Sequence, residues 1–365
     1  MGDTSERVVS DPAAYRWIAI LHLFFVLLSS VAVGDAIGKL TGAPVQVDLI
    51  GGVLCIYLAY WLIVVAHELG HAICVRILGW RAAVIAVRGL TIWPKPIRIR
   101  YGLPAFGGLG GGVLAVPPAD VGRFRFTLVH LGGALGNFAL AILLLAWREE
   151  IHHHLFWSRY LGACVFLSAL SGFINLLPLE RAGGVRFDGA RILDALRGAN
   201  LQWFGNTARL SEEFVRLRRP CDWHYDLVSA VTDDGELHGG WLIYCHALDC
   251  GDFKIARETL NRQISKGGMT LSLKVERAFL AAFADKDYQL AYKLLDQIKS
   301  RSMRRYPLYW RARAAADSAA RDLDALNQSV LRAKQAWKRA PFATASDFDF
   351  LDELVSSASN AADRP

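Results

Sequence analysis

Long apolar runs are confined to the first half of the chain. Four of them approach or exceed the roughly 20 residues that a transmembrane helix requires, at residues 17–33, 49–78, 126–147 and 160–179. After about residue 200, charged residues and apolar residues alternate as they do in ordinary helical proteins. The pattern predicts a mainly α protein, in which a polytopic membrane helix bundle of about four spans precedes a soluble α-helical domain.

The segment between the second and third runs has a different pattern of apolar and polar positions. Residues 82–87 and 96–101 are typical of β-strands, and the second of these alternates apolar with basic positions. A glycine-rich stretch follows at 107–112, and 113–116 could form another short strand. We expect a small β-ribbon against or within the bilayer. Its edges could bind an extended peptide by strand addition, although a hairpin that only packs the bundle explains the pattern equally well.

The C-terminal part carries a repeated pattern. Asp252, Asp287 and Asp322 recur at an offset of 35 residues, and apolar positions recur with them. A period in the mid-thirties is typical of helical-hairpin repeats of tetratricopeptide type, which bind peptides or protein partners. We therefore predict a membrane-embedded domain at 1–199, a helical repeat domain at 200–356 and a disordered polar tail at 357–365.

Composition and charge agree with a membrane location. The chain is 53% hydrophobic with 11 Trp, and its formal net charge is +7. Seven basic residues lie in 79–125, so the positive-inside rule places that segment and both termini in the cytoplasm. We expect a multi-pass protein of the inner or cytoplasmic membrane, with no nucleic-acid partner. The first run is expected to be a retained span, because residues 1–16 lack the features of a cleaved signal peptide.

The candidate chemistry lies within the second apolar run. His67, Glu68 and His71 form an H-E-x-x-H motif, and residues four apart lie on the same face of a helix. The two imidazoles can bind one Zn²⁺, with Glu68 as general base on a water at the metal. A charged group inside a membrane-length segment costs about 2.5–3.5 kcal/mol on insertion scales, which favours a function over a chance match.

A catalytic zinc site with two histidines commonly has a carboxylate as its third ligand. Asp188 and Glu180, which follow the fourth run, are the two candidates. Asn137 lies in the middle of the third run. It could contact a substrate carbonyl or a transition-state oxyanion, or it could bond to a neighbouring helix.

Four motifs together resemble the site-2 protease family of intramembrane zinc metalloproteases. They are His67–His71, Gly133–Asn137, Asn175–Pro178 and Asp188-Gly189. The resemblance implies a core of three transmembrane helices and one zinc per chain, bound by His67, His71 and Asp188, with Glu68 as the base. It also implies that Asn137 and Asn175 are the amides that contact substrate or oxyanion. Two departures are Ala134, where the family commonly has Pro, and a longer gap between Asn175 and Asp188, which keeps Glu180 as an alternative ligand.

The resemblance implies hydrolysis of a peptide bond in or near a transmembrane segment of a membrane protein, as in regulated intramembrane proteolysis. The expected partners are that substrate, the lipid bilayer and a cytoplasmic protein or peptide bound by the repeats. The alternative hypothesis is a catalytically silent membrane scaffold that recruits cytoplasmic partners. An intact set of His67, Glu68, His71 and Asp188 argues against it, because a scaffold has no need of a charged cluster in lipid.

Overall fold

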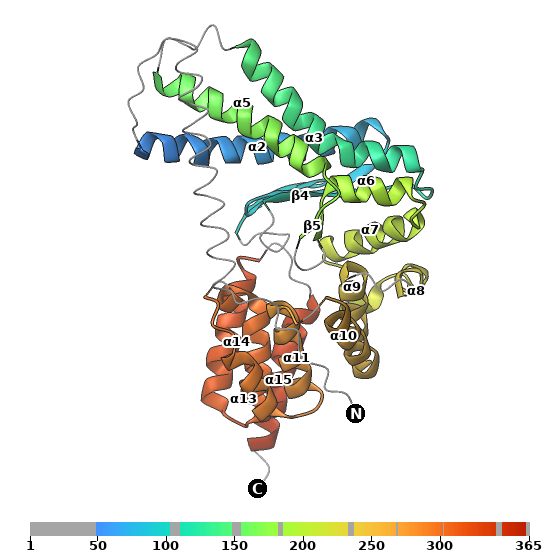
Figure 1. Cartoon of the computed structure of the whole chain (residues 1–365). Helices are drawn as coiled ribbons and strands as arrows, with labels where there is room; N and C mark the ends of the chain where they lie inside the picture. The colour runs from blue at the N-terminus through green and yellow to red at the C-terminus, as the bar shows by residue number, and fades with distance from the viewer. Residues whose placement is uncertain are drawn as a thin grey trace, which may run out of the picture. The chain divides into compact units, whose positions relative to one another are not determined.

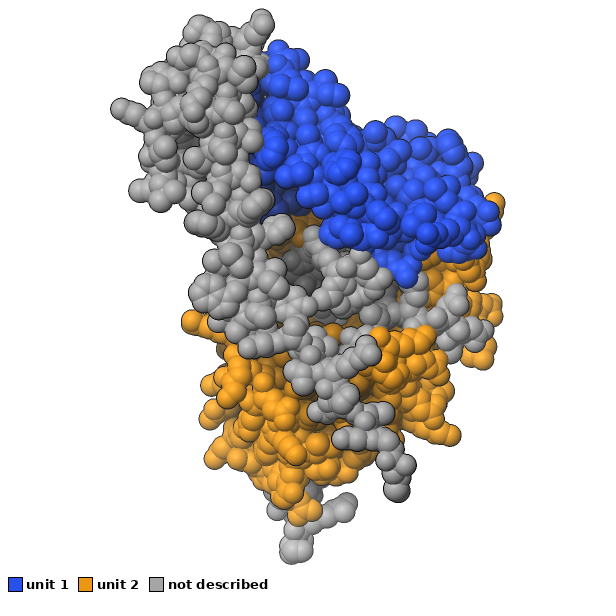
Figure 2. All heavy atoms as spheres, viewed as in Figure 1, with its two compact units in different colours: residues 1–79, 122–181, 185–199 blue, residues 80–121, 182–184, 200–365 orange. Residues whose placement is uncertain are grey.

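The computed structural model describes residues 49–102, 110–147, 155–181, 185–232, 237–267, 269–301, 303–340 and 345–362. The predicted first span at 17–33 lies outside the described residues. The chain divides into two compact units (Figure 2). Unit 1 comprises 1–79, 122–181 and 185–199, and unit 2 comprises 80–121, 182–184 and 200–365.

The described part of unit 1 contains three long helices and one short helix, which Figure 1 labels α2, α3, α5 and α6. The long helices are α2 (Leu49–Ile77), α3 (Arg123–Ala146) and α5 (Leu155–Leu176), and each packs against the other two. The strands β5 (Glu180–Arg181) and β6 (Val185–Arg186) pair as a short hairpin that precedes α6 (Asp188–Leu196). The short helix α6 packs against α3 and α5.

The helices of unit 1 bury several small residues and expose many of their large apolar ones. Helix α3 buries Gly132, Gly133 and Ala134, while Ile142 and Leu143 are more than half exposed. Such a distribution is typical of helices that face lipid, where small residues allow close packing. Within the described chain, α2 (over Ile56–Ile77) and α3 are long and apolar enough to cross a membrane, and α5 has a shorter apolar stretch, Tyr160–Leu176. The mainly helical class is confirmed, and four spans stay a prediction.

Helices α2 and α3 cross at three glycines. A Cβ at Gly70 would collide with the carbonyl oxygen of Gly132, and one at Gly136 would collide with the carbonyl oxygen of Ala66. A Cβ at Gly132 would lie 2.8 Å from the Sγ of Cys74. The backbones therefore approach as closely as the absence of side chains permits, as small residues at membrane helix contacts allow.

The first part of unit 2 is a four-stranded antiparallel sheet with the strand order β3-β2-β1-β4. The strands are β1 (Arg81–Val87), β2 (Leu90–Pro94), β3 (Ile97–Tyr101) and β4 (Gly111–Val116). Ile85 pairs with Ile92, and Ile92 pairs with Ile99. These three side chains therefore share one apolar face of the sheet.

The sequence analysis anticipated strands near β1, β3 and β4 but not β2. Strand β2 has the sequence Leu-Thr-Ile-Trp-Pro, so it lacks the alternation of apolar and basic residues that marks β3. A two-residue turn, Arg88-Gly89, connects it to β1, with positive φ angles of 45° and 91°. Two positive φ angles are the signature of a type I′ hairpin, for which Asn-Gly or Asp-Gly is the usual sequence signal.

The remaining described residues of unit 2 are mainly helical. Its elements are α7 (Leu201–Val215), η1 (Pro220–Asp222), α8 (Tyr225–Thr232), α9 (Leu237–Asp249), α10 (Phe253–Gly267), α11 (Leu271–Phe283), α12 (Tyr288–Asp296), η2 (Met303–Arg305), α13 (Pro307–Ala319), α14 (Leu323–Trp337) and α15 (Ala345–Ala362). Helix α15 continues into the range predicted as a tail, and residues 363–365 lie outside the described residues.

The 35-residue offset marks a repeated turn between paired helices. Asp252, Asp287 and Asp322 each precede the second helix of a pair, and each side chain accepts a hydrogen bond from the backbone N–H three residues later at 2.9–3.0 Å. Such N-caps fix where a helix begins. The residue before each aspartate has a positive φ, 75° at Gly251, 58° at Lys286 and 60° at Arg321. The pairs α9–α10, α11–α12 and α13–α14 thus share one turn geometry, and their tetratricopeptide type stays a prediction.

A buried ion pair ties the helices of unit 2 together. Glu276 of α11 accepts hydrogen bonds of 2.6 Å from Tyr244 of α9 and from Arg311 of α13. The guanidinium of Arg311 also lies 4.3 Å from the ring centre of Phe279. Glu276 is fully buried and Arg311 is 4% exposed, so neither charge has water to replace its partner.

We expect Arg311→Met to destabilise the chain by about 3–5 kcal/mol, because it leaves the Glu276 carboxylate buried without a counter-ion. Adding Glu276→Leu should recover most of that loss, since it removes the isolated charge. Chemical unfolding of the purified full chain, followed by far-UV circular dichroism, measures both values. A double variant no more stable than Arg311→Met would contradict this account.

Candidate metal centre

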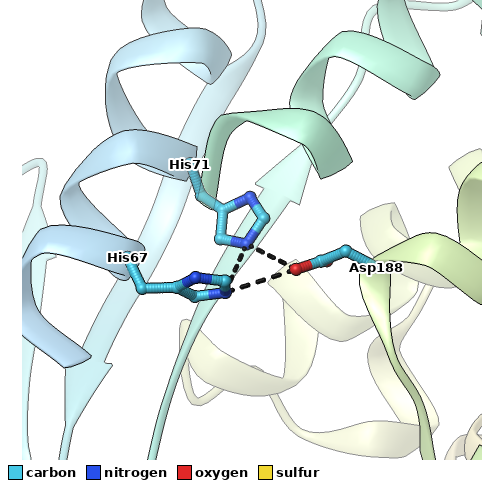
Figure 3. Close-up of side chains that lie close together, drawn as sticks. All are labelled: His67, His71 and Asp188. Carbon is cyan, nitrogen blue, oxygen red and sulfur yellow. Dashed lines mark hydrogen bonds and ion pairs between the residues drawn. The ribbon is translucent and has the colours of Figure 1, made fainter. Parts of the chain in front are cut away.

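Three potential metal ligands meet in unit 1 (Figure 3). His67 and His71 lie one turn apart on α2, and their Nε2 atoms are 3.2 Å from each other. Asp188 is the first residue of α6, and its Oδ2 atom lies 3.3 Å from each of the two Nε2 atoms. Among the described residues, these three form the one group of His, Cys, Asp or Glu side chains placed to share an ion.

The spacing of the three atoms fits zinc. Zinc binds imidazole nitrogen at about 2.0–2.1 Å and carboxylate oxygen at about 2.0–2.2 Å, usually as a tetrahedron. Neighbouring corners of such a tetrahedron are about 3.3–3.6 Å apart, by multiplying these bond lengths by about 1.63. The observed separations of 3.2, 3.3 and 3.3 Å match three corners. With an ion bound, the fourth corner would stay open, as it does in catalytic zinc sites.

Gly133 of α3 lines the same space. A Cβ at this position would collide with Nε2 of His71 and with Nε2 of His67. These are the atoms that would face a metal ion, so any side chain here would occupy the metal's surroundings. Gly133 therefore leaves room for a metal ion, and Gly136 of the same stretch allows close packing against α2.

The outer nitrogen of each histidine also has a partner on α3. Nδ1 of His71 donates to the backbone carbonyl of Val129 at 2.7 Å. Nδ1 of His67 lies 3.2 Å from the side-chain amide of Asn137. A neutral histidine that offers Nε2 to a metal keeps its proton on Nδ1, so His67 donates to Asn137 when the amide presents its oxygen. Both rings are thereby held with Nε2 toward Asp188.

A polar chain extends from this contact into α5. The Asn137 amide lies 3.3 Å from the hydroxyl of Ser171, and the Asn175 amide donates to the backbone carbonyl of Ser171 at 2.9 Å. Ser168 donates to the backbone carbonyl of Asn137 at 2.8 Å. Ser171 thus links Asn175 to Asn137, and Asn137 contacts His67 directly. Their contact with substrate or an oxyanion stays a prediction.

Asp188 is the ligand whose placement depends most on tertiary structure. A Cβ at Gly189 would collide with the backbone carbonyl of Leu176, so only glycine lets the start of α6 lie this close to the end of α5. Burial disfavours the charged carboxylate, but hydrogen bonds from His130, His67 and His71 outweigh it and hold the pKa of Asp188 well below its usual range. The alternative ligand Glu180 has its backbone in β5, and its side chain lies outside the described residues.

Glu68 is buried beside the ligands. It is 6% exposed and interacts electrostatically with His71, His67 and Asp188. In the described part of unit 1, two buried side-chain oxygens have no hydrogen-bond partner, Oε2 of Glu68 and Oδ1 of Asn137. Oε2 of Glu68 is left to accept a hydrogen bond from a water or a substrate.

One polar residue of the site was missed in the sequence analysis. Nδ1 of His130, on α3, lies 3.0 Å from Oδ1 of Asp188. A single histidine in an apolar run has no spacing that relates it to a carboxylate 58 residues later. Its position three residues before Gly133 was the available signal, since residues three apart share a helix face.

The sequence comparisons agree with this chemistry. A segment of 200 residues is 35% identical to the protein named "Putative zinc metalloprotease Rip2" in two strains of Mycobacterium tuberculosis, Erdman and H37Rv. The match covers 50% of this chain and 72% of each relative. No family model and no solved structure matches the chain.

We expect Gly133→Ala to weaken zinc binding by about tenfold or more, because the added methyl group displaces both imidazoles from the metal. Gly122→Ala is the matched control, since a Cβ there meets open space. Competition with a chromogenic chelator measures the zinc affinity of each purified protein. Equal affinities for the two variants would show that Gly133 does not line the metal site.

Proposed function

Because the chain belongs to the zinc metalloprotease family of Rip2, we propose that it is a membrane-embedded zinc endopeptidase of the site-2 protease type. Its substrate would be a membrane protein cleaved in or near a transmembrane segment. Such cleavage serves regulated intramembrane proteolysis. The observation that carries the proposal is the tetrahedral spacing of His67 Nε2, His71 Nε2 and Asp188 Oδ2.

His67, His71 and Asp188 would hold the ion. A bound Zn²⁺ supplies a Lewis acid that polarises a peptide carbonyl and makes water more acidic near neutral pH. Glu68 accepts the proton of the attacking water at Oε2, a buried atom that has no hydrogen-bond partner among the described residues. Glu68 then transfers this proton to the leaving amine. Asn137 and Asn175 are proposed as amides that position substrate or stabilise the oxyanion.

The location in the membrane is argued from the helices that carry the site. His67 and His71 lie within the apolar stretch Ile56–Ile77, and large apolar side chains of α2 and α3 are exposed rather than buried. We propose a multi-pass protein with both termini in the cytoplasm, as the excess of basic residues in 79–125 indicates.

A helical substrate must first become extended, because its backbone hydrogen bonds engage the carbonyl groups. Strand β3 is an edge of the sheet, and Ile97, Ile99 and Tyr101 are 67–79% exposed. We propose that this edge accepts an extended segment of substrate by strand addition.

The paired helices α9–α14 favour a role in partner binding beside catalysis. Their three hairpins share one turn geometry, as stacked repeats that present a continuous surface do. We propose that they bind a cytoplasmic protein or peptide. A scaffold without catalysis is the second candidate, and it does not account for a buried Glu68 beside three metal-ligand atoms.

The test measures zinc and cleavage in the same preparations. Wild type and Glu68→Gln, purified in detergent, should each hold one zinc per chain, while Asp188→Ala should lose it. Cleavage of a single-span reporter protein with a Gly-Pro pair inside its span should fall by about 10²–10⁴-fold in Glu68→Gln, because the general base is missing. Mass spectrometry of the products locates the cut.

Three results would contradict the proposal. Wild-type protein without zinc would remove the metalloprotease assignment. Zinc retained in full by Asp188→Ala would make Glu180 the better ligand candidate. Zinc-loaded wild type that cleaves the reporter no faster than Glu68→Gln would favour the scaffold.

A further inference from the structure

We propose that His130 is a positioning residue that fixes the carboxylate of Asp188 so that one chosen oxygen faces the metal. The inference rests on the proposed function, since it concerns the same zinc site. The inference goes beyond the proposed function because it assigns a role to a residue outside the H-E-x-x-H motif and the Asp-Gly pair.

The two oxygens of Asp188 have separate partners. Oδ2 lies 3.3 Å from Nε2 of His67 and 3.3 Å from Nε2 of His71. Oδ1 lies 3.0 Å from Nδ1 of His130. A neutral His130 that carries its proton on Nδ1 donates it to Oδ1, and this leaves Oδ2 alone at the third corner of the tetrahedron. The arrangement corresponds to a carboxylate that binds metal through one oxygen.

The ring of His130 is itself held in place. Phe126, one turn earlier on α3, packs against it with ring centres 4.5 Å apart. The side chain of His130 is 24% exposed, so protein surrounds most of the ring. The donor atom therefore points at Asp188 from a rigid helix.

His130 completes a pattern in which each ligand has one partner on α3. His71 donates to the carbonyl of Val129, and His67 contacts the amide of Asn137. Asp188 belongs to another element, α6, and its carboxylate could rotate about its own side-chain bonds. Partners that orient a ligand typically change metal affinity by 10–100-fold. For Asp188, His130 is that partner.

The geometry does not make His130 a fourth ligand. Its Nδ1 is engaged by Oδ1 of Asp188, on the side of the carboxylate away from Oδ2. Within the described residues, the set of ligand atoms close enough to share an ion consists of His67, His71 and Asp188. The role assigned to His130 is orientation of a ligand.

Two variants of His130 separate this role from simple packing. His130→Leu fills most of the space and removes the donor. His130→Asn keeps an amide N–H close to the position of Nδ1, so it should restore the contact with Oδ1. His224→Leu is the control for loss of a histidine, because His224 is exposed and lies in unit 2.

The experiment measures zinc affinity of each full-length protein in detergent, by chelator competition, together with the melting temperature after zinc removal. We expect His130→Leu to bind zinc about 10–100-fold more weakly than wild type. His130→Asn should stay within a few-fold of wild type, and His224→Leu should equal it. All four zinc-free proteins should melt at similar temperatures, because the contact between His130 and Asp188 orients the carboxylate and contributes little to the stability of the fold.

Several outcomes overturn the inference. Unchanged affinity in His130→Leu would show that Asp188 needs no orientation. Equal weakening in His130→Leu and His130→Asn, with a lowered melting temperature in both, would show that the ring serves packing. His130→Leu could fail to fold. In that case, a His130→Asn protein that folds yet binds zinc as weakly as Asp188→Ala would also overturn the inference, because the restored amide N–H would not have restored zinc binding. Wild type without zinc would overturn the proposed function itself, and this inference with it.

Discussion

The close crossing of α2 and α3 is the contact on which the site depends. Gly70, Gly132 and Gly136 leave backbone against backbone, so α3 lies near enough for Gly133 to line the space between the imidazoles. The same approach brings the carbonyl of Val129 within 2.7 Å of His71. A bulkier residue at the crossing would move every partner that α3 provides away from its ligand. Helix packing and metal chemistry are therefore one constraint in unit 1.

That constraint explains how polar groups are accommodated between apolar helices. A buried polar atom without a partner is expensive in an apolar environment, and more so in lipid. The ligands avoid this cost because hydrogen bonds to α3 satisfy their outer atoms and a metal would satisfy their inner ones. Many large apolar side chains of the same helices are exposed, as they would be against lipid. Close interior packing and an apolar exterior thus result from the same sequence pattern.

Local periodicity explains which features could be predicted from the sequence. His67 and His71 belong to one helix turn, and Asp252, Asp287 and Asp322 are N-caps whose partners lie three residues away. Such relations depend on neighbours in the chain alone. His130 and Asp188 meet only through the packing of α6 against α3, for which neither residue carries a local signal. Strand β2 was missed for a related reason, because Arg88-Gly89 is an uncommon turn sequence and the strand lacks the alternation of apolar and basic residues that marks β3.

The position of Asp188 explains why an aspartate at the start of a helix suits this site. As the first residue of α6 it lies at the positive end of the helix dipole, which favours the ionised carboxylate that a cation requires. Its short side chain reaches the histidines only because Gly189 lets α6 begin against the end of α5. A metal ion held by these three side chains would keep one corner of its tetrahedron open. Glu68 is buried close to them, and its Oε2 has no hydrogen-bond partner among the described residues. An open corner beside an available base is what distinguishes a hydrolytic site from a structural one.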